Sequence, residues 1–144
     1  MKTVRQLLQA KGYAIWSITP DASVFDALEL MAEKDIGALL VLDGGKPVGI
    51  ISERDYARKV ILKGKASKET PVREIMTEEI VCVRPDQTTE ECMALMTDKR
   101  VRHLPVIESE RLIGVISIGD VVKGIISAQE FMIEQLADYI TGKR

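Results

Sequence analysis

The chain has 144 residues, a mass of 16.0 kDa, 46% hydrophobic residues and a formal net charge of −2. This length suits one domain with its own core, and the slightly acidic balance disfavours a protein built to bind nucleic acid or an anionic membrane. Only 4% of the residues are aromatic, so few platforms exist for stacking the bases of a single strand. One histidine and two separated cysteines disfavour a structural metal site.

The N-terminal segment does not resemble a secretory signal, because Lys2 to Lys11 is a polar amphipathic stretch. No apolar run approaches the roughly 20 residues that a membrane span needs. Cys82 and Cys92 fall in a predicted strand and a predicted helix, and we interpret both as reduced thiols in the core. We therefore predict a cytoplasmic protein that needs no metal and does not contact a membrane.

The sequence contains one unit twice, at a shift of 65 positions. Between Ser17 and Val60 this shift needs no gap, and 11 of the 44 paired positions are identical. Upstream, residues 4–8 (VRQLL) resemble residues 72–76 (VREIM) at a shift of 68, so the first copy carries three extra residues before its first strand. Such a repeat predicts two supersecondary units that pack on each other and share a core.

In chain order, the sequence pattern of each copy predicts a strand, a helix, a β-hairpin and a second helix. The first helix of each copy begins at a capping box, formed by Ser23 with Asp26 or by Thr88 with Glu91. The predicted strands are 15–18, 38–42 and 48–51 in the first copy and 80–83, 104–107 and 112–116 in the second. The fold class is therefore mixed α and β (α+β), with two βαββα repeats packed about a pseudo-two-fold axis.

The predicted boundaries are 1–62 for the first repeat with its N-terminal helix, 63–71 for a polar linker and 72–144 for the second repeat. The last helix, from about Gly119 to Ile140, is longer than its counterpart and has apolar residues on more than one face. Exposed apolar surface on a terminal helix predicts a partner helix, most simply from a second subunit.

A short motif at the end of each hairpin carries the candidate chemistry. Gly49-Ile50-Ile51-Ser52-Glu53-Arg54-Asp55 recurs as Gly114-Val115-Ile116-Ser117-Ile118-Gly119-Asp120. In each copy a strand ends, the serine starts a helix, and the aspartate lies one turn inside. One interpretation is a structural capping box. The other is nucleotide binding, with amides and the serine on a phosphate and the aspartate on a ribose. The spacing alone does not separate these two.

The motif resembles the nucleotide-binding signature of the CBS domain, named after cystathionine β-synthase and found in tandem pairs called Bateman modules. Residues 72–77 (VREIMT), 85–86 (PD) and 102–106 (RHLPV) also resemble family segments. The resemblance covers nearly the whole chain. It implies a regulatory CBS pair with no catalytic or transport domain attached.

The resemblance also implies site residues. Ser52 with Asp55, and Ser117 with Asp120, would hold the phosphate and ribose of an adenine nucleotide in two clefts between the copies. The remaining candidate contacts are Ile15, Trp16, Arg54, Thr77, Ile80, Val81, Arg102 and His103.

The two sites are expected to be unequal. Arg102 and His103 lie where related modules direct basic residues toward phosphate, whereas the first copy has Gly37 and Ala38 at the matching positions. An alternative for His103 is a strand-edge residue with local hydrogen bonds. Arg54 is expected to supply positive charge that Gly119 cannot.

We therefore predict a non-enzymatic regulatory sensor that binds AMP, ADP, ATP or NAD(H), forms a homodimer through its helices and acts on another protein. One alternative is an interaction protein without ligand, in which the Ser and Asp pairs are only caps. Nucleic-acid binding through the basic stretch 54–73 is a second, disfavoured by overall acidity. An enzyme acting on the nucleotide is a third, disfavoured because no nucleophile has a matching base and orienting acid.

Overall fold

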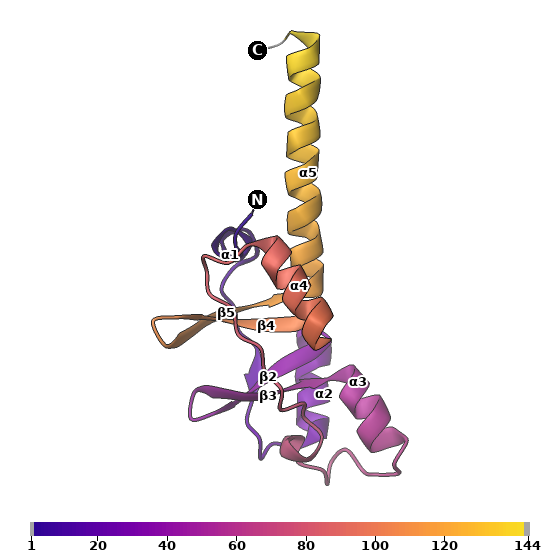
Figure 1. The fold of residues 1–144 in the computed structure, drawn as a ribbon. Coiled ribbons are helices and arrows are strands. Elements are labelled where there is room, and N and C mark those ends of the chain that lie inside the picture. Colours follow the sequence, from indigo (N-terminus) through magenta and orange to yellow (C-terminus); the bar gives the residue numbers. More distant parts are fainter. Residues whose placement is uncertain (1, 143–144) are drawn as a thin grey trace. The chain divides into compact units, whose positions relative to one another are not determined.

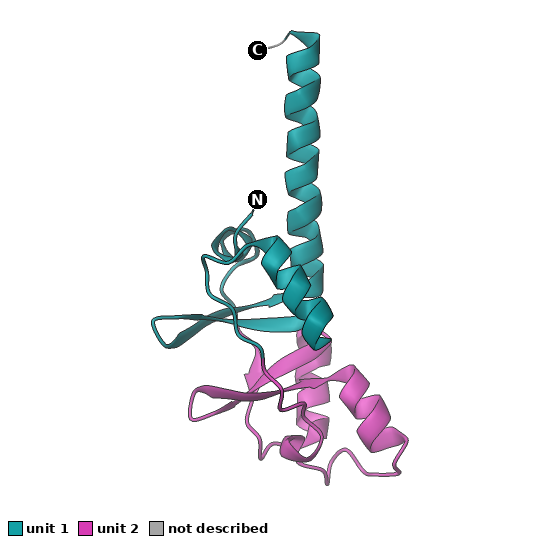
Figure 2. Cartoon of the chain, in the orientation of Figure 1, with its two compact units in different colours: residues 1–14, 81–144 teal, residues 15–80 magenta. Residues whose placement is uncertain are grey.

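The computed structural model describes residues 2–142, which form two compact units (Figure 1). Unit 1 comprises residues 1–14 and 81–144, and unit 2 comprises residues 15–80 (Figure 2). Each unit has its own buried apolar cluster. The repeats are therefore built around two cores, instead of the one shared core that the sequence repeat predicted.

This division differs from the predicted boundaries at residues 62 and 72. Residues 1–14 belong to the unit of the second repeat, and residues 63–80 belong to the unit of the first. The physical reason is the burial of matching apolar residues: Val4 and Leu8 lie in the core of unit 1, whereas Val72 and Ile75 lie in the core of unit 2. Each repeat is thus completed by a segment that precedes the other repeat in the sequence.

Unit 2 is a three-stranded sheet with helices and a long final segment. Its elements are β1 (Ser17–Ile18), α2 (Val24–Lys34), β2 (Ala38–Asp43), β3 (Lys46–Ser52), α3 (Glu53–Tyr56), a π-helix (Ala57–Ile61) and a 3₁₀ turn (Val72–Glu74). The strand order is β1-β2-β3, with β1 parallel and β3 antiparallel to β2. The helix after the hairpin is therefore short and changes to π geometry after one turn.

Helix α2 begins at the predicted N-cap, Ser23, but Asp26 does not return the second hydrogen bond of the predicted capping box. Ser23 accepts a hydrogen bond from the Asp26 N–H at 3.0 Å, and Asp35 ends the helix in the left-handed region at φ 54°. The helix buries Val24, Ala27 and Met31 in the core of unit 2. This spacing of three and four residues is the apolar stripe of a helix packed on one side.

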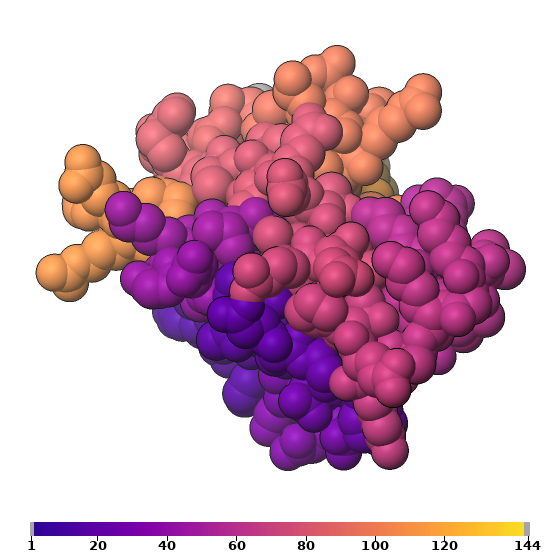
Figure 3. Space-filling model, turned by 90° about the horizontal axis from the view of Figure 1, so that it is seen from below, coloured from indigo at the N-terminus to yellow at the C-terminus, as the bar shows by residue number. Residues whose placement is uncertain are grey.

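The stretch that follows the π-helix covers the start of α2. The Val24 N–H donates to the Thr70 carbonyl at 2.9 Å, and the Phe25 N–H donates to the Ser67 carbonyl at 3.1 Å. These bonds satisfy amides that have no partner inside the helix. In the space-filling view this rose-coloured stretch lies against the violet surface of residues near 20 to 30 (Figure 3). The predicted linker is thus part of the fold of unit 2.

Unit 1 is a two-stranded hairpin packed with three helices. Its elements are α1 (Val4–Lys11), α4 (Thr89–Lys99), β4 (His103–Glu108), β5 (Arg111–Ser117) and α5 (Ile118–Thr141). Helix α1 contacts both β5 and α5. The N-terminal helix therefore takes part in the packing around the hairpin that precedes α5.

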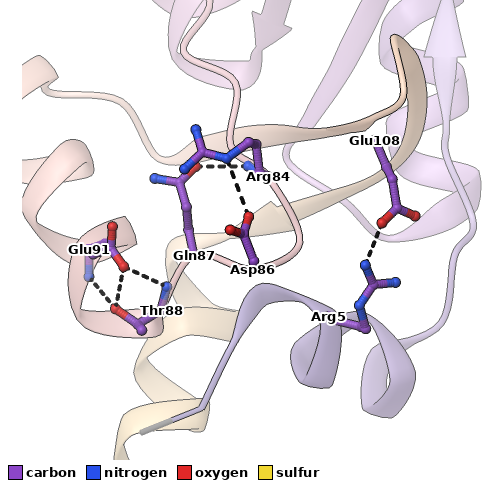
Figure 4. Close-up of polar contacts among 7 residues, drawn as sticks. All are labelled: Arg5, Arg84, Asp86, Gln87, Thr88, Glu91 and Glu108. Atoms are coloured by element: carbon purple, nitrogen blue, oxygen red, sulfur yellow. Dashed lines mark hydrogen bonds and ion pairs between the residues drawn. The ribbon is translucent and has the colours of Figure 1, made fainter.

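Polar contacts at the surface of unit 1 fix the ends of these elements (Figure 4). Thr88 and Glu91 form the predicted capping box of α4, with the Glu91 N–H donating to Thr88 Oγ1 at 3.1 Å. Arg5 on α1 pairs with Glu108 at the end of β4. This ion pair adds a polar contact between α1 and the hairpin.

The predicted strand 80–83 is reduced to a single parallel bridge between Val83 and Val106. Val83 donates to the Pro105 carbonyl at 2.9 Å and accepts from the Ile107 N–H at 2.9 Å. In unit 2, the Leu40 N–H donates to the Trp16 carbonyl, and Pro105 matches Leu40 in the repeat. Because proline has no N–H, the corresponding bond cannot form and the ladder does not extend.

Helix α5 extends far beyond the hairpin on which it starts (Figure 1). Its first turns bury Val121 and Gly124, whereas Phe131, Met132 and Ile133 are more than 60% exposed. Despite this apolar surface, no helix among residues 2–142 is long and apolar enough to span a membrane.

Candidate functional site

Both predicted motifs form capping boxes at a strand-to-helix junction. Ser52 begins α3 and accepts from the Asp55 N–H at 3.2 Å, while Ser117 begins α5 and accepts from the Asp120 N–H at 3.2 Å. Each aspartate in turn accepts from the N–H of its serine, at 3.0 Å and 2.8 Å. The structural interpretation of the motif is therefore correct in both units, and nucleotide binding would have to use residues that already cap helices.

The motif glycines have a packing role that the sequence did not reveal. A Cβ on Gly114 would lie 2.7 Å from Leu8 Cδ2, and a Cβ on Gly49 would lie 2.7 Å from Met76 Sδ. Leu8 and Met76 match each other in the repeat at the shift of 68. Each glycine therefore allows the segment that completes its unit, through Leu8 or Met76, to pack directly on the strand that precedes the serine.

In unit 2 the Asp55 carboxylate is occupied on both oxygens. Oδ2 accepts from the N–H and the hydroxyl of Ser52, each at 3.0 Å. Oδ1 accepts from the Thr77 hydroxyl and lies against the Lys59 ammonium, each at 3.2 Å. Asp55 is only 8% exposed. This carboxylate is therefore buried with a full set of donors.

In unit 1 the Asp120 carboxylate is held on one oxygen. Oδ2 accepts from the Ser117 N–H at 2.8 Å and from the Lys11 ammonium at 2.6 Å. None of the hydrogen bonds found within residues 2–142 ends on Oδ1. Burial acts to raise the pKa of the Asp120 carboxyl, but the hydrogen bonds from Lys11 and Ser117 outweigh it and lower that pKa. Asp120 is thus an ionised group that still offers an acceptor.

Lys11 also reaches the end of strand β5. Its ammonium donates to the Val115 carbonyl at 2.7 Å. In unit 2 the matching carbonyl, that of Ile50, accepts instead from the Thr77 backbone N–H at 2.8 Å. In unit 1, Lys11 therefore takes the place of both the Thr77 N–H and the Lys59 ammonium of unit 2. It also joins the end of α1 to β5 and α5.

His103 and Arg102 lie beside the same serine. His103 is the ladder partner of Ser117, and the Arg102 carbonyl accepts from the Ile118 N–H at 2.9 Å. Burial, followed by the charges of Lys11 and Arg102, lowers the pKa of His103, and Asp120 opposes this shift. His103 is therefore a neutral imidazole at pH 7 within a cationic environment. In unit 2 the position opposite Ser52 is Ala38.

The other predicted site residues divide between the units. Trp16 is 42% exposed and has the Lys34 ammonium 4.3 Å from its ring centroid, an interaction that covers part of the ring. Ile15, Arg54, Thr77 and Ile80 also belong to unit 2, while Val81 belongs to unit 1. Of these, Thr77 is brought to Asp55 by its hydrogen bond. The predicted clefts between the copies stay a prediction.

Sequence reasoning missed both lysines that hold the aspartates. Lys59 had a recognisable signal, because an acid and a lysine four residues apart in a helix commonly pair. Lys11 had none, since it lies outside the region aligned by the 65-residue shift. The repeat even argues against the pairing, because the residue matching Lys59 is Gly124, where a Cβ would lie 2.6 Å from Leu7 Cδ2.

A family model described as CBS domain matches the chain twice, over residues 12–62 and 72–127. The CBS domain-containing protein CBSX3, mitochondrial, of Arabidopsis thaliana is 40% identical over 150 residues, covering 97% of this chain and 72% of that protein. The fold and the repeat inferred from the sequence are therefore confirmed.

Solved structures agree. A putative signal-transduction protein with CBS domains from Burkholderia ambifaria is 55% identical, with a TM-score of 0.85 over 89% of this chain and 96% of that one. The CBS domain protein PAE2072 from Pyrobaculum aerophilum, solved in complex with AMP, is 22% identical, with a TM-score of 0.72 over 83% of this chain and 89% of that one. At that identity the second likeness concerns the fold alone.

Proposed function

The chain belongs to the CBS domain family, and from this we propose that it is a regulatory protein that binds an adenine nucleotide. Two CBS domains make up most of the chain. The ligand we propose is AMP, ADP, ATP or NAD(H). The observation that carries the proposal is the cluster around Asp120, where an ionised carboxylate, a helix-capping serine and the cations Lys11 and Arg102 occur together.

Each part of that cluster suits one part of a nucleotide. A carboxylate oxygen accepts hydrogen bonds from ribose hydroxyls, and the start of the 24-residue helix α5 favours a negatively charged group. Lys11 and Arg102 add positive charge for a phosphate. The AMP complex of PAE2072 supports the choice of an adenine nucleotide, because that protein shares the fold.

The regulatory step follows from differential affinity. A ligand changes the behaviour of a protein only if it binds one conformation or assembly more tightly than another. We propose that nucleotide occupancy shifts the binding of this protein to a protein partner. The proposed location is the cytoplasm, where Cys82 and Cys92, both free thiols, would stay reduced.

The direct test is calorimetric titration of the purified protein with AMP, ADP, ATP and NAD(H). Binding of one of these at micromolar to low millimolar concentration supports the proposal. No heat of binding at millimolar ligand, together with an unchanged thermal midpoint, would leave the interaction protein without ligand as the better description. Mass spectrometry of ligand released from the purified protein then identifies which nucleotide was bound.

We also propose that the protein forms a homodimer through helix α5. Apolar residues recur along it at alternating steps of four and three residues, which is the pattern of paired helices. The residues on this line are Ile118, Val122, Ile125, Met132, Leu136 and Tyr139, with Gln129 in the middle. Glu130 and Glu134 lie on the opposite face of the helix, so two copies can meet without opposing like charges.

The dimer proposal has its own test. Light scattering after size exclusion is expected to give twice the 16.0 kDa mass of the chain. Leu136→Lys places a charge in the apolar line and is expected to yield monomer, whereas Glu134→Lys changes charge on the outer face and is expected to stay dimeric. A wild-type mass of 16.0 kDa at high protein concentration would contradict the proposal.

A further inference from the structure

We infer that the nucleotide competes with Lys11 for the Asp120 carboxylate, and that the matching carboxylate, Asp55, is closed to ligand. The inference rests on the proposed function and adds to it which half of the repeat accepts the ribose and which residue must move. Lys11 is then a displaceable counter-ion and Lys59 a permanent one.

The two carboxylates differ in the hydrogen bonds that their oxygens accept. Asp55 accepts hydrogen bonds on both oxygens, including one from the Thr77 hydroxyl. The residue matching Thr77 at the shift of 68 is Gln9, and no hydrogen bond joins it to Asp120 among residues 2–142. A ribose hydroxyl therefore has an acceptor at Asp120 Oδ1, whereas at Asp55 it would first have to expel a partner from each oxygen.

The two lysines are held in place in different ways. Lys59 lies one turn after Asp55 on the same helical segment and donates to the Ile75 carbonyl at 2.9 Å, so it belongs to the fold around Asp55. Lys11 is the last residue of α1, and Gly12, at φ 104°, follows it directly. The Lys11 side chain therefore reaches Asp120 from a helix end, from which it can turn away when a ligand arrives.

The two aspartates also differ in the length of their helices and in the charged residues around them. Asp120 lies in the first turn of a 24-residue helix, whereas α3 after Ser52 has four residues before the π-helix begins. Arg102 and His103 accompany Asp120, and Gly37 and Ala38 stand at the matching positions of the other repeat. A ligand with ribose and phosphate therefore meets Arg102 and the start of a long helix at Asp120, whereas at Asp55 it meets Arg54 at the start of a short one.

Displacement of Lys11 links ligand binding to the contacts of helix α1. Lys11 bonds simultaneously to the Val115 carbonyl on β5 and to Asp120 on α5. A ribose that takes the carboxylate removes one of these two tethers and leaves the ammonium close to the phosphate of the same ligand. The end of α1 is then held by the ligand instead of by α5, so occupancy is transmitted to the N-terminal helix.

The test is calorimetric titration with AMP and with adenosine, which has the ribose but no phosphate. Wild type is expected to bind one AMP per chain. Asp120→Asn and Asp55→Asn are matched changes at the same helical position: the first is expected to weaken AMP binding at least tenfold, and the second to change it less than twofold while lowering thermal stability.

Lys11→Met distinguishes competition between Lys11 and the ligand for Asp120 from a direct favourable contact of Lys11 with the ligand. With its competitor removed, adenosine is expected to bind about fivefold more tightly, in line with the loss of a partly exposed ion pair. AMP is expected to gain less, because its phosphate loses a nearby cation. Lys2→Met removes an equal charge on the approach to α1, where Lys2 pairs with Ser127, and is expected to leave both affinities unchanged.

Two results would overturn the inference while the proposed function stands: equal loss of AMP affinity in the two Asn variants, or weaker adenosine binding in Lys11→Met. Failure of every chain, including Lys11→Met, to bind AMP or adenosine at millimolar concentration would instead remove the proposed function, and the inference with it.

Discussion

Gly114→Ala is expected to destabilise the protein by detaching α1 from the hairpin of unit 1. The new Cβ would lie 2.7 Å from Leu8 Cδ2 and 3.3 Å from Leu8 Cδ1, so both methyl groups at the end of that side chain are too close. Leu8 is 1% exposed and has no solvent to turn into. Overpacking of this kind costs about 1–3 kcal/mol.

Urea denaturation followed by circular dichroism measures this cost. For a slope of about 2 kcal/mol per molar urea, a loss of about 2 kcal/mol lowers the midpoint by about 1 M. Gly119→Ala is the control, because the nearest atom to its Cβ is Ser117 Oγ at 3.6 Å and alanine favours the helix by up to about 1 kcal/mol.

A double-mutant cycle with Leu8→Ala tests whether the contact with Leu8 causes this loss of stability. If the contact with Leu8 causes the loss, Gly114→Ala is expected to cost almost nothing once Leu8 is alanine, although Leu8→Ala itself costs about 2–5 kcal/mol. Additive losses, or a Gly114→Ala midpoint equal to that of wild type, would show that the close approach has no energetic role.

Three further outcomes are expected. The pKa of His103 is lowered in the folded protein, so protonation of this side chain favours unfolding, and the free energy of unfolding is expected to fall as pH drops below about 6.5. An NMR titration of this single histidine and urea midpoints from pH 7.5 to 5 check this. Lys59→Met is expected to cost about 1–2 kcal/mol, because buried Asp55 loses its cation, and a loss below about 0.3 kcal/mol in urea would contradict this. The expectation that both thiols lie in the core is wrong for Cys82, which is exposed, so a thiol reagent at pH 8 is expected to modify it in the folded protein, although partial burial raises its pKa. Cys92 is expected to react only on unfolding, because it is fully buried and burial raises its pKa to about 11; two thiols per chain that react before unfolding would contradict this.

Local signals in the sequence predicted the elements that depend on local chemistry. The capping residues Ser23 and Thr88 start α2 and α4, and the polar turns join the two strands of each hairpin. These features depend on hydrogen bonds between neighbours in the chain, which a pattern of residue types records. The serine and aspartate pairs were also identified, with both of their possible roles.

Features that depend on distant contacts were not predictable in the same way. Lys11 reaches Asp120 across 109 positions, and its partner at Val115 is a backbone carbonyl that carries no sequence signal. The π geometry after Tyr56 has no residue signature either. The shortened strand at Val83 could have been predicted, because Pro105 has no N–H for the ladder. The alignment of the two copies suggested instead that both have the same strands.

The assignment of residues 1–14 to unit 1 has a consequence during synthesis on the ribosome. Residues 15–80 are continuous in the chain, so this unit is synthesised whole before β5 and α5, whereas α1 must wait for those two elements. At about 5–20 residues per second, the 109 positions between Lys11 and Asp120 correspond to a delay of roughly 5–20 s. Throughout that interval Val4, Leu7 and Leu8 lack their native core, so the newly made N-terminus presents apolar surface to chaperones and proteases. Cutting the gene between its two repeats would make this exposure permanent.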